Sequence, residues 1–215
     1  MVDGLRERNK AKRRAAVLDA ALELLDRTDG TPVTTERIAE AAEVSPATVY
    51  NLVGTRSQLL AAALDRIIAD LVGHAIDSPP AGDPIGAMRD LTERAVAALT
   101  ARPVAHRRVV LELTAAASAD LHTKLSPATL FEVGLERARA AGLVRDDLDV
   151  RALAMQMYLA FNGALLRWAA GALTDAGFRT AALHGLTTVL AAAATPASRR
   201  RLLDDLRSLG AQGLT

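Results

Sequence analysis

The segment SPATVYN, residues 45–51, places small and polar side chains where a short helix is predicted to begin. The amide of Asn51 can form two hydrogen bonds with the edge of an adenine base, and Ala47 or Pro46 can contact the methyl group of thymine. Such contacts distinguish base pairs when a helix enters the major groove of a DNA duplex. The chemistry offered by this segment is therefore non-covalent reading of base edges.

Residues that support catalysis are not gathered in the same way. The chain has no cysteine, which excludes disulfides and thiolate chemistry. The sequence RDDLDV, residues 145–150, is typical of a loop that ends in a helix cap rather than of a cation site. Four histidines lie far apart from one another in the chain: His74, His106, His122 and His184. We expect no enzymatic activity, no metal ion and no cofactor.

Three helix-start signals position the segment. Thr34 precedes one stretch with helical apolar spacing, and Ser45 with Pro46 marks the start of the next helix. The serine oxygen can accept hydrogen bonds from the free N–H groups of the first turn. Proline is tolerated there because the N–H that it lacks would have no partner within the helix. Thr55 with Gln58 forms a capping box for a longer helix that extends to about residue 76. The middle helix, which ends near Leu52, is therefore only about two turns long.

A helix near residues 12–28 and the helix after Thr34 can support that short helix. The following apolar residues are spaced to pack the helices together: Ile38, Ala39, Ala42, Val44, Val49 and Val53. Pro46, Ala47, Thr48, Tyr50 and Asn51 are then left to point outwards. Two helices joined by a tight turn in this way predict a helix-turn-helix.

The same residues resemble a known family. The pattern T-x-x-x-IA-x-x-A-x-VS-x-x-T-x-Y, which begins at Thr34 and ends at Tyr50, is similar to the DNA-binding segment of the TetR (tetracycline-repressor) family of regulators. The detailed resemblance covers residues 12–64, and beyond them the length and helical character of the chain agree with the family.

The resemblance implies roles for individual residues. It assigns Thr48, Tyr50 and Arg56 to backbone phosphates and Ser45, Pro46, Ala47 and Asn51 to base edges. Thr34, Lys12 and Arg13 complete the predicted DNA-binding set. Each assignment has an ordinary alternative: Ser45 can serve only as a cap, Tyr50 can only pack, and Asn51 can be solvated.

The sequence departs from the family pattern at four positions. Glu43 occupies the turn where the family usually has glycine, and a non-glycine residue with positive φ there costs about 1 kcal/mol. Leu52 stands where the family frequently has His or Tyr, and Val53 stands where it commonly has an aromatic residue, which affects the contacts at the end of the short helix. Arg56 replaces the usual lysine and keeps its positive charge.

The rest of the chain is also predicted to be helical. The sequence DSPPAGDP, residues 77–84, is the clearest break, and further helices are expected near residues 85–100, 104–119, 127–141, 150–173, 178–194 and 196–209. The predicted fold is all-α, with an N-terminal three-helix helix-turn-helix domain and a basic arm over residues 1–57. A larger helical ligand-binding and dimerisation domain is expected over residues 58–215.

One reading helix makes too few base contacts for selective binding, so two copies are expected on a palindromic operator. We expect a homodimer whose last two long helices form a four-helix interface, as the family implies. The alternative is that these helices form only the core of a single chain. The residues predicted at the interface lie in a stretch rich in small side chains: Leu183, Leu186, Thr187 and Leu190.

Family members commonly bind a small effector among the middle helices. We expect a mostly apolar effector here, because few charged residues are available. The alternative is that the aromatic stripe of residues 158–168 is plain core. The predicted lining comprises Met88, Leu91, His106, Glu112, Leu113, Phe131, Tyr158, Phe161, Asn162 and Trp168.

The charge distribution is uneven although the net charge is only +1. Residues 1–14 contain six basic and two acidic residues, a net charge of +4, which either approaches a polyanion or forms a solvated terminus. No signal-peptide core follows, and residues 180–198 are too weakly apolar to span a bilayer, so we expect a cytoplasmic protein without a membrane segment.

Together these features predict a sequence-specific DNA-binding transcriptional regulator. The resemblance favours a repressor that a small, mostly apolar ligand releases from its operator. A helical protein–protein adaptor that has kept the fold but lost DNA binding is the alternative, and Glu43, Leu52 and Val53 are the residues that favour it.

Overall fold

The computed structural model describes residues 2–27, 31–77, 82–115 and 127–213. Within these ranges the chain is helical, and the only extended pairing recorded is an isolated bridge between Val144 and Ala194. The predicted all-α class is therefore confirmed. No helix among the described residues is long and apolar enough to cross a membrane.

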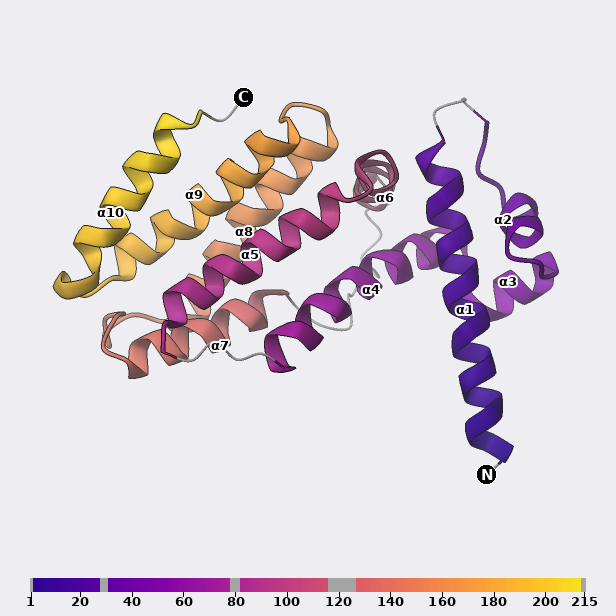
Figure 1. Ribbon diagram of the computed structural model, residues 1–215, viewed down its shortest axis with the longest axis horizontal. Helices are drawn as coiled ribbons and strands as arrows, with labels where there is room; N and C mark the ends of the chain where they lie inside the picture. Colours follow the sequence, from indigo (N-terminus) through magenta and orange to yellow (C-terminus); the bar gives the residue numbers. More distant parts are fainter. Residues whose placement is uncertain (1, 28–30, 78–81, 116–126, 214–215) are drawn as a thin grey trace. The chain divides into compact units, whose positions relative to one another are not determined.

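Figure 1 shows the helices in their order along the chain. They are α1 (Val2–Asp26), α2 (Thr35–Ala41), α3 (Pro46–Val53), α4 (Arg56–Asp77), α5 (Pro84–Thr100), α6 (Pro103–Ala115), α7 (Pro127–Ala140), α8 (Val150–Ala169), α9 (Asp175–Ala193) and α10 (Pro196–Ala211).

Several helix ends differ from those expected. α1 starts ten residues before the predicted residue 12, because its charged N-terminal part continues the helix without an apolar face. α8 ends at Ala169 rather than near residue 173, since Gly171 has φ of 76° and interrupts the helix. α9 then begins at Asp175, where the Thr174 hydroxyl accepts a hydrogen bond from the Gly177 N–H. The predicted region 116–119 of α6 lies outside the described residues.

The chain forms two compact units. The first unit contains residues 1–67 and 102–123, and the second contains residues 68–101 and 124–215. The predicted boundary between residues 57 and 58 falls near the start of α4, whereas the division between the units falls further along the same helix. α6 follows the break at residues 77–84 but belongs to the first unit.

The first unit has its own apolar core. α1 contacts α2, α3 and α6, and the buried side chains include Val17, Leu18, Leu22, Ile38, Val49, Leu60 and Val109. α3 contributes the buried Val49 and Val53 and the partly buried Leu52 to this core, and its opposite face is exposed.

The second unit is a bundle of α5, α7, α8, α9 and α10, in which α9 contacts α5, α8 and α10. Its core includes Met88, Phe131, Leu135, Met157, Leu186, Leu190 and Leu202. The predicted aromatic stripe on α8 contributes Trp168, which stacks on Phe178 with ring centroids 5.2 Å apart. The Trp168 indole N–H donates to the Asp175 carboxylate at the start of α9, at 2.7 Å.

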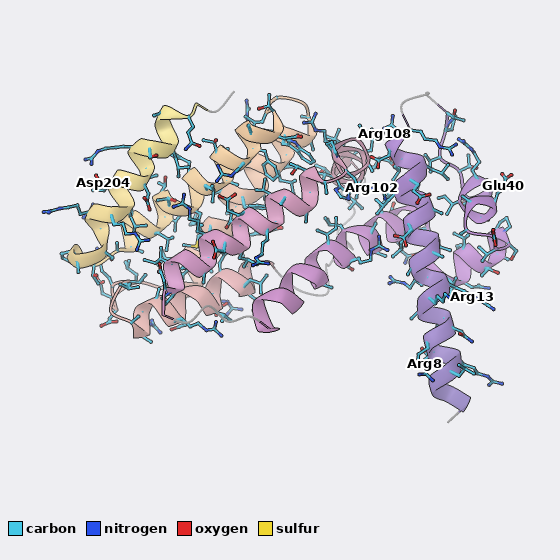
Figure 2. The ribbon with its side chains drawn as sticks, viewed as in Figure 1. Arg8, Arg13, Glu40, Arg102, Arg108 and Asp204 are labelled. Atoms are coloured by element: carbon cyan, nitrogen blue, oxygen red, sulfur yellow. The ribbon has the colours of Figure 1, made fainter. Side chains whose placement is uncertain are left out.

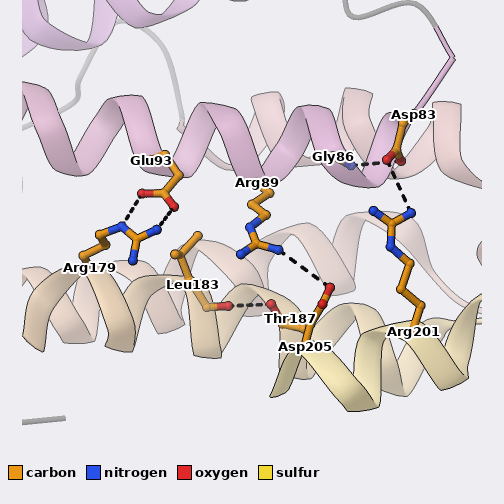
Figure 3. Close-up of polar contacts among 9 residues, drawn as sticks. All are labelled: Asp83, Gly86, Arg89, Glu93, Arg179, Leu183, Thr187, Arg201 and Asp205. Atoms are coloured by element: carbon orange, nitrogen blue, oxygen red, sulfur yellow. Dashed lines mark hydrogen bonds and ion pairs between the residues drawn. The ribbon is translucent and has the colours of Figure 1, made fainter. Parts of the chain in front are cut away.

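Ion pairs link α5 to the helices beside it (Figure 3). The two carboxylate oxygens of Glu93 on α5 accept from Nε and Nη2 of Arg179 on α9, and Arg89 lies 3.7 Å from Asp205 on α10. Asp83 caps α5 by accepting from the Gly86 N–H at 3.0 Å and lies 3.7 Å from Arg201. The side chains of these ion pairs are partly exposed to solvent, so each pair contributes only about 0–1 kcal/mol.

α8 and α9 approach each other closely at Gly185. A Cβ at this position would lie 2.8 Å from the Cβ of Ala160, with the backbone of Ala160 directly behind it. A methyl side chain cannot move aside by changing its rotamer, so the two helices would have to separate.

We therefore expect Gly185→Ala to lower the free energy of unfolding by about 1–2 kcal/mol, because the overpacking penalty exceeds the gain in helix propensity. Gly210→Ala is the matched control, since no atom lies within 4 Å of a Cβ there, and it should be neutral or stabilising. Urea unfolding can be followed through Trp168, the single tryptophan, which is fully buried in this unit. Equal midpoints for the two variants would contradict the close packing.

Candidate nucleic-acid interface

The turn between α2 and α3 has the predicted backbone strain. Thr34 caps α2, and its hydroxyl accepts from the Arg37 N–H at 3.4 Å. After α2, the Val44 N–H returns to the Ala39 carbonyl at 2.9 Å, which forces Glu43 between them into a left-handed conformation with φ of 54°. Glu43 is the only non-glycine residue with positive φ recorded among the described residues. The prediction made for this position is confirmed.

α3 is fixed at both of its ends. Ser45 caps it by accepting from the Thr48 N–H at 3.2 Å, and the Ser45 and Thr48 hydroxyls lie 2.8 Å apart. Pro46 occupies the first turn, as the Ser-Pro pair predicted. The helix ends at Val53, and Gly54, with φ of 81°, turns the chain towards α4.

The side chains of α3 divide into two faces. Val49 is 1% exposed and Val53 is buried, whereas Tyr50 is 63% exposed. Pro46, Ala47 and Asn51 are also exposed, and Thr48 is half-buried. The residues predicted to point outwards therefore lie mainly on the exposed side of α3, while Val49 and Val53 pack against the core of the first unit.

Arg56 has partners that the sequence did not suggest. Its Nε and Nη2 donate to the two carboxylate oxygens of Glu112 at 2.8 and 2.9 Å, and its Nη1 donates to the Val33 carbonyl at 2.5 Å. The predicted phosphate contact of Arg56 would compete with these three bonds. Glu112, predicted to line an effector pocket, is instead tied to the start of α4. The capping box next to Arg56 forms as predicted, with Gln58 accepting from the Thr55 N–H at 2.8 Å.

α6 is fastened to α1 by further polar contacts. The Asp26 carboxylate accepts from the Ala105 N–H at 3.0 Å and from Arg102 at 2.9 Å. Arg108 donates to the carbonyls of Leu25 and Arg27, at 2.8 and 2.9 Å, and so satisfies the end of α1. Figure 2 labels Arg102 and Arg108. The contacts of these three side chains were not predicted, because no local sequence pattern indicates contacts between residues about 80 positions apart in the chain.

The predicted effector residues fall into both units. His106 and Leu113 are buried in α6 of the first unit, as part of the same segment that carries Glu112. Met88, Phe131 and Trp168 are buried in the core of the second unit. Leu91, Tyr158, Phe161 and Asn162 are half-buried there, and Phe161 lies 5.7 Å from Phe178 between ring centroids.

The four predicted interface residues are not available to a second chain, which corrects that assignment. Leu183, Leu186, Thr187 and Leu190 are all buried inside the second unit. They face α5, α8 and α10, so the small and apolar stretch of α9 serves the core of the chain. A dimer interface must use other residues.

Lys12 and Arg13 do not share one face of α1. Successive residues of a helix are rotated by about 100°, so Arg13 lies near the line of the buried residues Val17 and Leu24, and Lys12 lies on the far side. Both side chains are exposed. Only Arg13 is therefore retained as a candidate phosphate contact.

One carboxylate of the helix-turn-helix has a shifted pKa. The pKa of Glu36, in the first turn of α2, lies below its ordinary value because its carboxylate accepts a backbone N–H and then a bond from Thr34. No group of acidic, histidine or cysteine side chains that could hold a metal ion occurs among the described residues. The surface around α3 is suited to hydrogen bonding and apolar contact.

Comparison with known proteins agrees with this geometry. The family model for bacterial regulatory proteins of the tetR family matches residues 17–63, which span the C-terminal part of α1, all of α2 and α3, and the start of α4. The search of curated proteins gave no match.

Several solved structures have a similar fold. A TetR-family transcriptional repressor, FadR of Thermus thermophilus in complex with lauroyl-CoA, is 21% identical and has a TM-score of 0.66, with 82% of this chain and 93% of that chain covered. NalD, the secondary repressor of the MexAB-OprM multidrug efflux pump of Pseudomonas aeruginosa, is 22% identical (TM-score 0.59; 87% and 98% covered). TylP, a TetR regulator from Streptomyces fradiae, is 20% identical (TM-score 0.63; 94% and 97% covered).

The three N-terminal helices thus define a helix-turn-helix domain of the class found in transcriptional regulators. The tetR family model matches this N-terminal part of the chain, and the fold of the chain is similar to that of solved TetR-family regulators.

The strained turn gives a direct test of the site. Glu43→Gly should raise the free energy of unfolding by about 1 kcal/mol relative to Glu43→Ala, because glycine alone relieves the left-handed conformation. Both variants lose the same charge, so their difference isolates the backbone. Urea unfolding followed by far-ultraviolet circular dichroism measures it, and an alanine variant as stable as the glycine variant would argue against this turn geometry.

Proposed function

We propose that the protein is a sequence-specific DNA-binding transcriptional regulator that places α3 in the major groove. The observation that carries this proposal is the division of α3 into a buried face, with Val49, and an exposed end, with Tyr50, Ala47 and Asn51. Tyr50 is 63% exposed, so packing within the chain does not explain the presence of its large aromatic ring.

Individual roles follow from the geometry of each side chain. Tyr50 offers a hydroxyl to a phosphate, and Asn51 offers an amide to adenine. Pro46 and Ala47 supply apolar contacts for a thymine methyl group. Thr48 is bound to Ser45 through its hydroxyl, so both residues contribute to DNA binding mainly by holding the start of α3. Thr34 similarly holds the start of α2.

We further propose that DNA binding is repressive and that an apolar ligand relieves it. Two of the structures with a similar fold are described as repressors, and one of these contains lauroyl-CoA. Aromatic and amide side chains on α8, among them Tyr158, Phe161 and Asn162, are half-buried and could contact such a ligand. A coupling of about 1–3 kcal/mol between ligand and DNA would change affinity about 5- to 150-fold.

The contacts of α6 offer a physical basis for that coupling. Arg56 joins Glu112 on α6 to the carbonyl of Val33, which directly precedes the cap of α2. A shift of α6 would therefore act on the loop that leads into the helix-turn-helix. In the present arrangement the Arg56 guanidinium is held by Glu112 and Val33, so the phosphate contact predicted from the sequence competes with these bonds.

Selection of bound duplexes from a random pool, followed by affinity measurements at several salt concentrations, tests DNA binding. Tyr50→Ala should weaken binding to all sequences, whereas Asn51→Ala should change the preference at one base position by about 1–3 kcal/mol. Neither truncation should unfold the chain, since both side chains are exposed.

The adaptor alternative predicts a different result. Several phosphate contacts make affinity fall steeply as salt rises, so absent or salt-insensitive binding by the parent chain would favour the adaptor. Unchanged affinity and preference in both variants would remove α3 from the interface.

A cytoplasmic homodimer on a palindromic operator is part of the proposal. Met155 and Leu159 on α8 are 43% and 50% exposed, and they lie on one face with the exposed Ala152 and Gly163. Two neighbouring large apolar side chains beside small residues allow a second copy of the same helix to approach closely. This stripe replaces the four buried residues of α9 as the proposed interface.

Leu159→Arg should therefore give monomers while leaving the chain folded, because the side chain already contacts water in the single chain. Val133→Arg on α7 is the matched control, since Val133 is comparably exposed and lies outside the stripe. Light scattering measures the mass and circular dichroism the helix content. A dimer that survives Leu159→Arg, or that Val133→Arg also dissociates, would refute this interface.

A further inference from the structure

The N-terminal part of α1 extends beyond the core of the first unit. Residues 4–14 are exposed throughout, and the first buried side chain of the helix is Val17. Figures 1 and 2 show this part of α1 continuing past α3, with Arg8 and Arg13 on it. Because a helix rises 1.5 Å per residue, the extension is about 15–20 Å long, close to the width of a DNA duplex.

The extension concentrates positive charge. Residues 4–14 include Arg6, Arg8, Lys10, Lys12, Arg13 and Arg14 but only one acidic residue, Glu7, so their net charge is +5 while that of the whole chain is +1. Among the residues that the structure describes, none of these six cations is paired with a carboxylate. The single polar contact recorded for them is from Arg8 to the Gly4 carbonyl within the same helix.

Three of the cations form a line along α1. Arg6, Lys10 and Arg13 follow one another at spacings of four and three residues, which places them on one face. The same line continues through Val17, Ala21 and Leu24, the residues by which α1 is buried in the first unit. We call Arg6, Lys10 and Arg13 the basic stripe. Arg8 and Lys12 lie on the opposite side of the helix.

The structure points to a second DNA-contact surface, and we propose that the basic stripe binds backbone phosphates of the duplex that flanks the site read by α3. This inference rests on the proposed DNA binding and adds a partner surface to it. A row of cations separated by about one helical turn can neutralise phosphates without reading bases, so the stripe adds affinity and lengthens the footprint but leaves sequence preference unchanged.

Continuity with the buried face of α1 is the reason for choosing this side. The residues that follow the stripe pack in the unit that carries α3, so the stripe keeps a fixed rotation relative to α3. A flexible tail would lose conformational entropy on binding, whereas a preformed helix has already fixed its backbone. The basic stripe therefore faces a defined direction, whereas the other three cations, Arg8, Lys12 and Arg14, only add to the overall positive potential.

Two charge-matched variants of the full chain test this inference. Arg6→Gln with Lys10→Gln removes two charges from the stripe, and Arg8→Gln with Lys12→Gln removes two from the opposite side. Glutamine keeps helix propensity similar, which circular dichroism can verify. Affinity is measured for a selected operator duplex with about ten extra base pairs on each side and for the same duplex trimmed to the sequence that α3 selects.

On the long duplex the stripe variant should bind about tenfold or more weakly, and its salt slope should fall by about two for each bound chain. The opposite-side variant should change affinity by less than about threefold. On the trimmed duplex both variants should bind like the parent, and base preference should be the same throughout.

Equal losses in the two variants, or an equal loss of the stripe variant on both duplexes, would overturn the proposed surface. These results differ from failure of the proposed function. If the parent binds the operator and responds to Asn51→Ala while the stripe variant changes nothing, only the stripe is refuted. If the parent shows no salt-dependent DNA binding at all, both proposals fall together.

Discussion

The burial of Val49 and Val53 is the constraint on which the candidate site depends. α3 is too short to be stable alone, because helices of this length in water do not recover the cost of their first turn. Packing of its two valines against the rest of the first unit holds the helix in place and sets its rotation. The same packing decides that Tyr50, Ala47 and Asn51 face outwards. Loss of this apolar contact would remove the exposed face together with the helix.

Local chemistry made much of this arrangement predictable. Thr34, Ser45 with Pro46, and Thr55 with Gln58 each act within three or four residues, and each formed the cap that its type and spacing indicated. The strain at Glu43 was predictable for the same reason, since a turn between two packed helices needs a left-handed residue. Hydrogen bonds between near neighbours in sequence are encoded directly in residue order.

Contacts between distant residues were not predictable in this way. Glu112 looks like a polar pocket residue until α6 is placed in the first unit, where its carboxylate meets Arg56. Leu183 to Leu190 form an apolar stretch that suits either a core or an interface, and periodicity cannot tell which surface covers them. Their burial by α5, α8 and α10 moved the proposed interface to Met155 and Leu159. The start of α1 was missed because a charged helix has no apolar period.

Arg56 connects these two levels of structure. It begins α4 beside a local capping box, yet its guanidinium joins the loop before α2 to a residue 56 positions away. Asp26 and Arg108 form similar long-range contacts at the end of α1. The orientation of the helix-turn-helix is thus set partly by side chains that have no place in the motif itself.

The first unit is consequently discontinuous in the chain. The polypeptide leaves it within α4, builds α5 in the second unit, and returns to supply α6 before leaving again. A fragment cut after residue 67 would lack Ala105, Val109 and Leu113 from its core and would leave the carboxylate of Asp26 and the carbonyls that end α1 without their partners. The helix-turn-helix of this protein therefore does not form a complete folding unit by itself, and transferring it to another scaffold would require a substitute for α6.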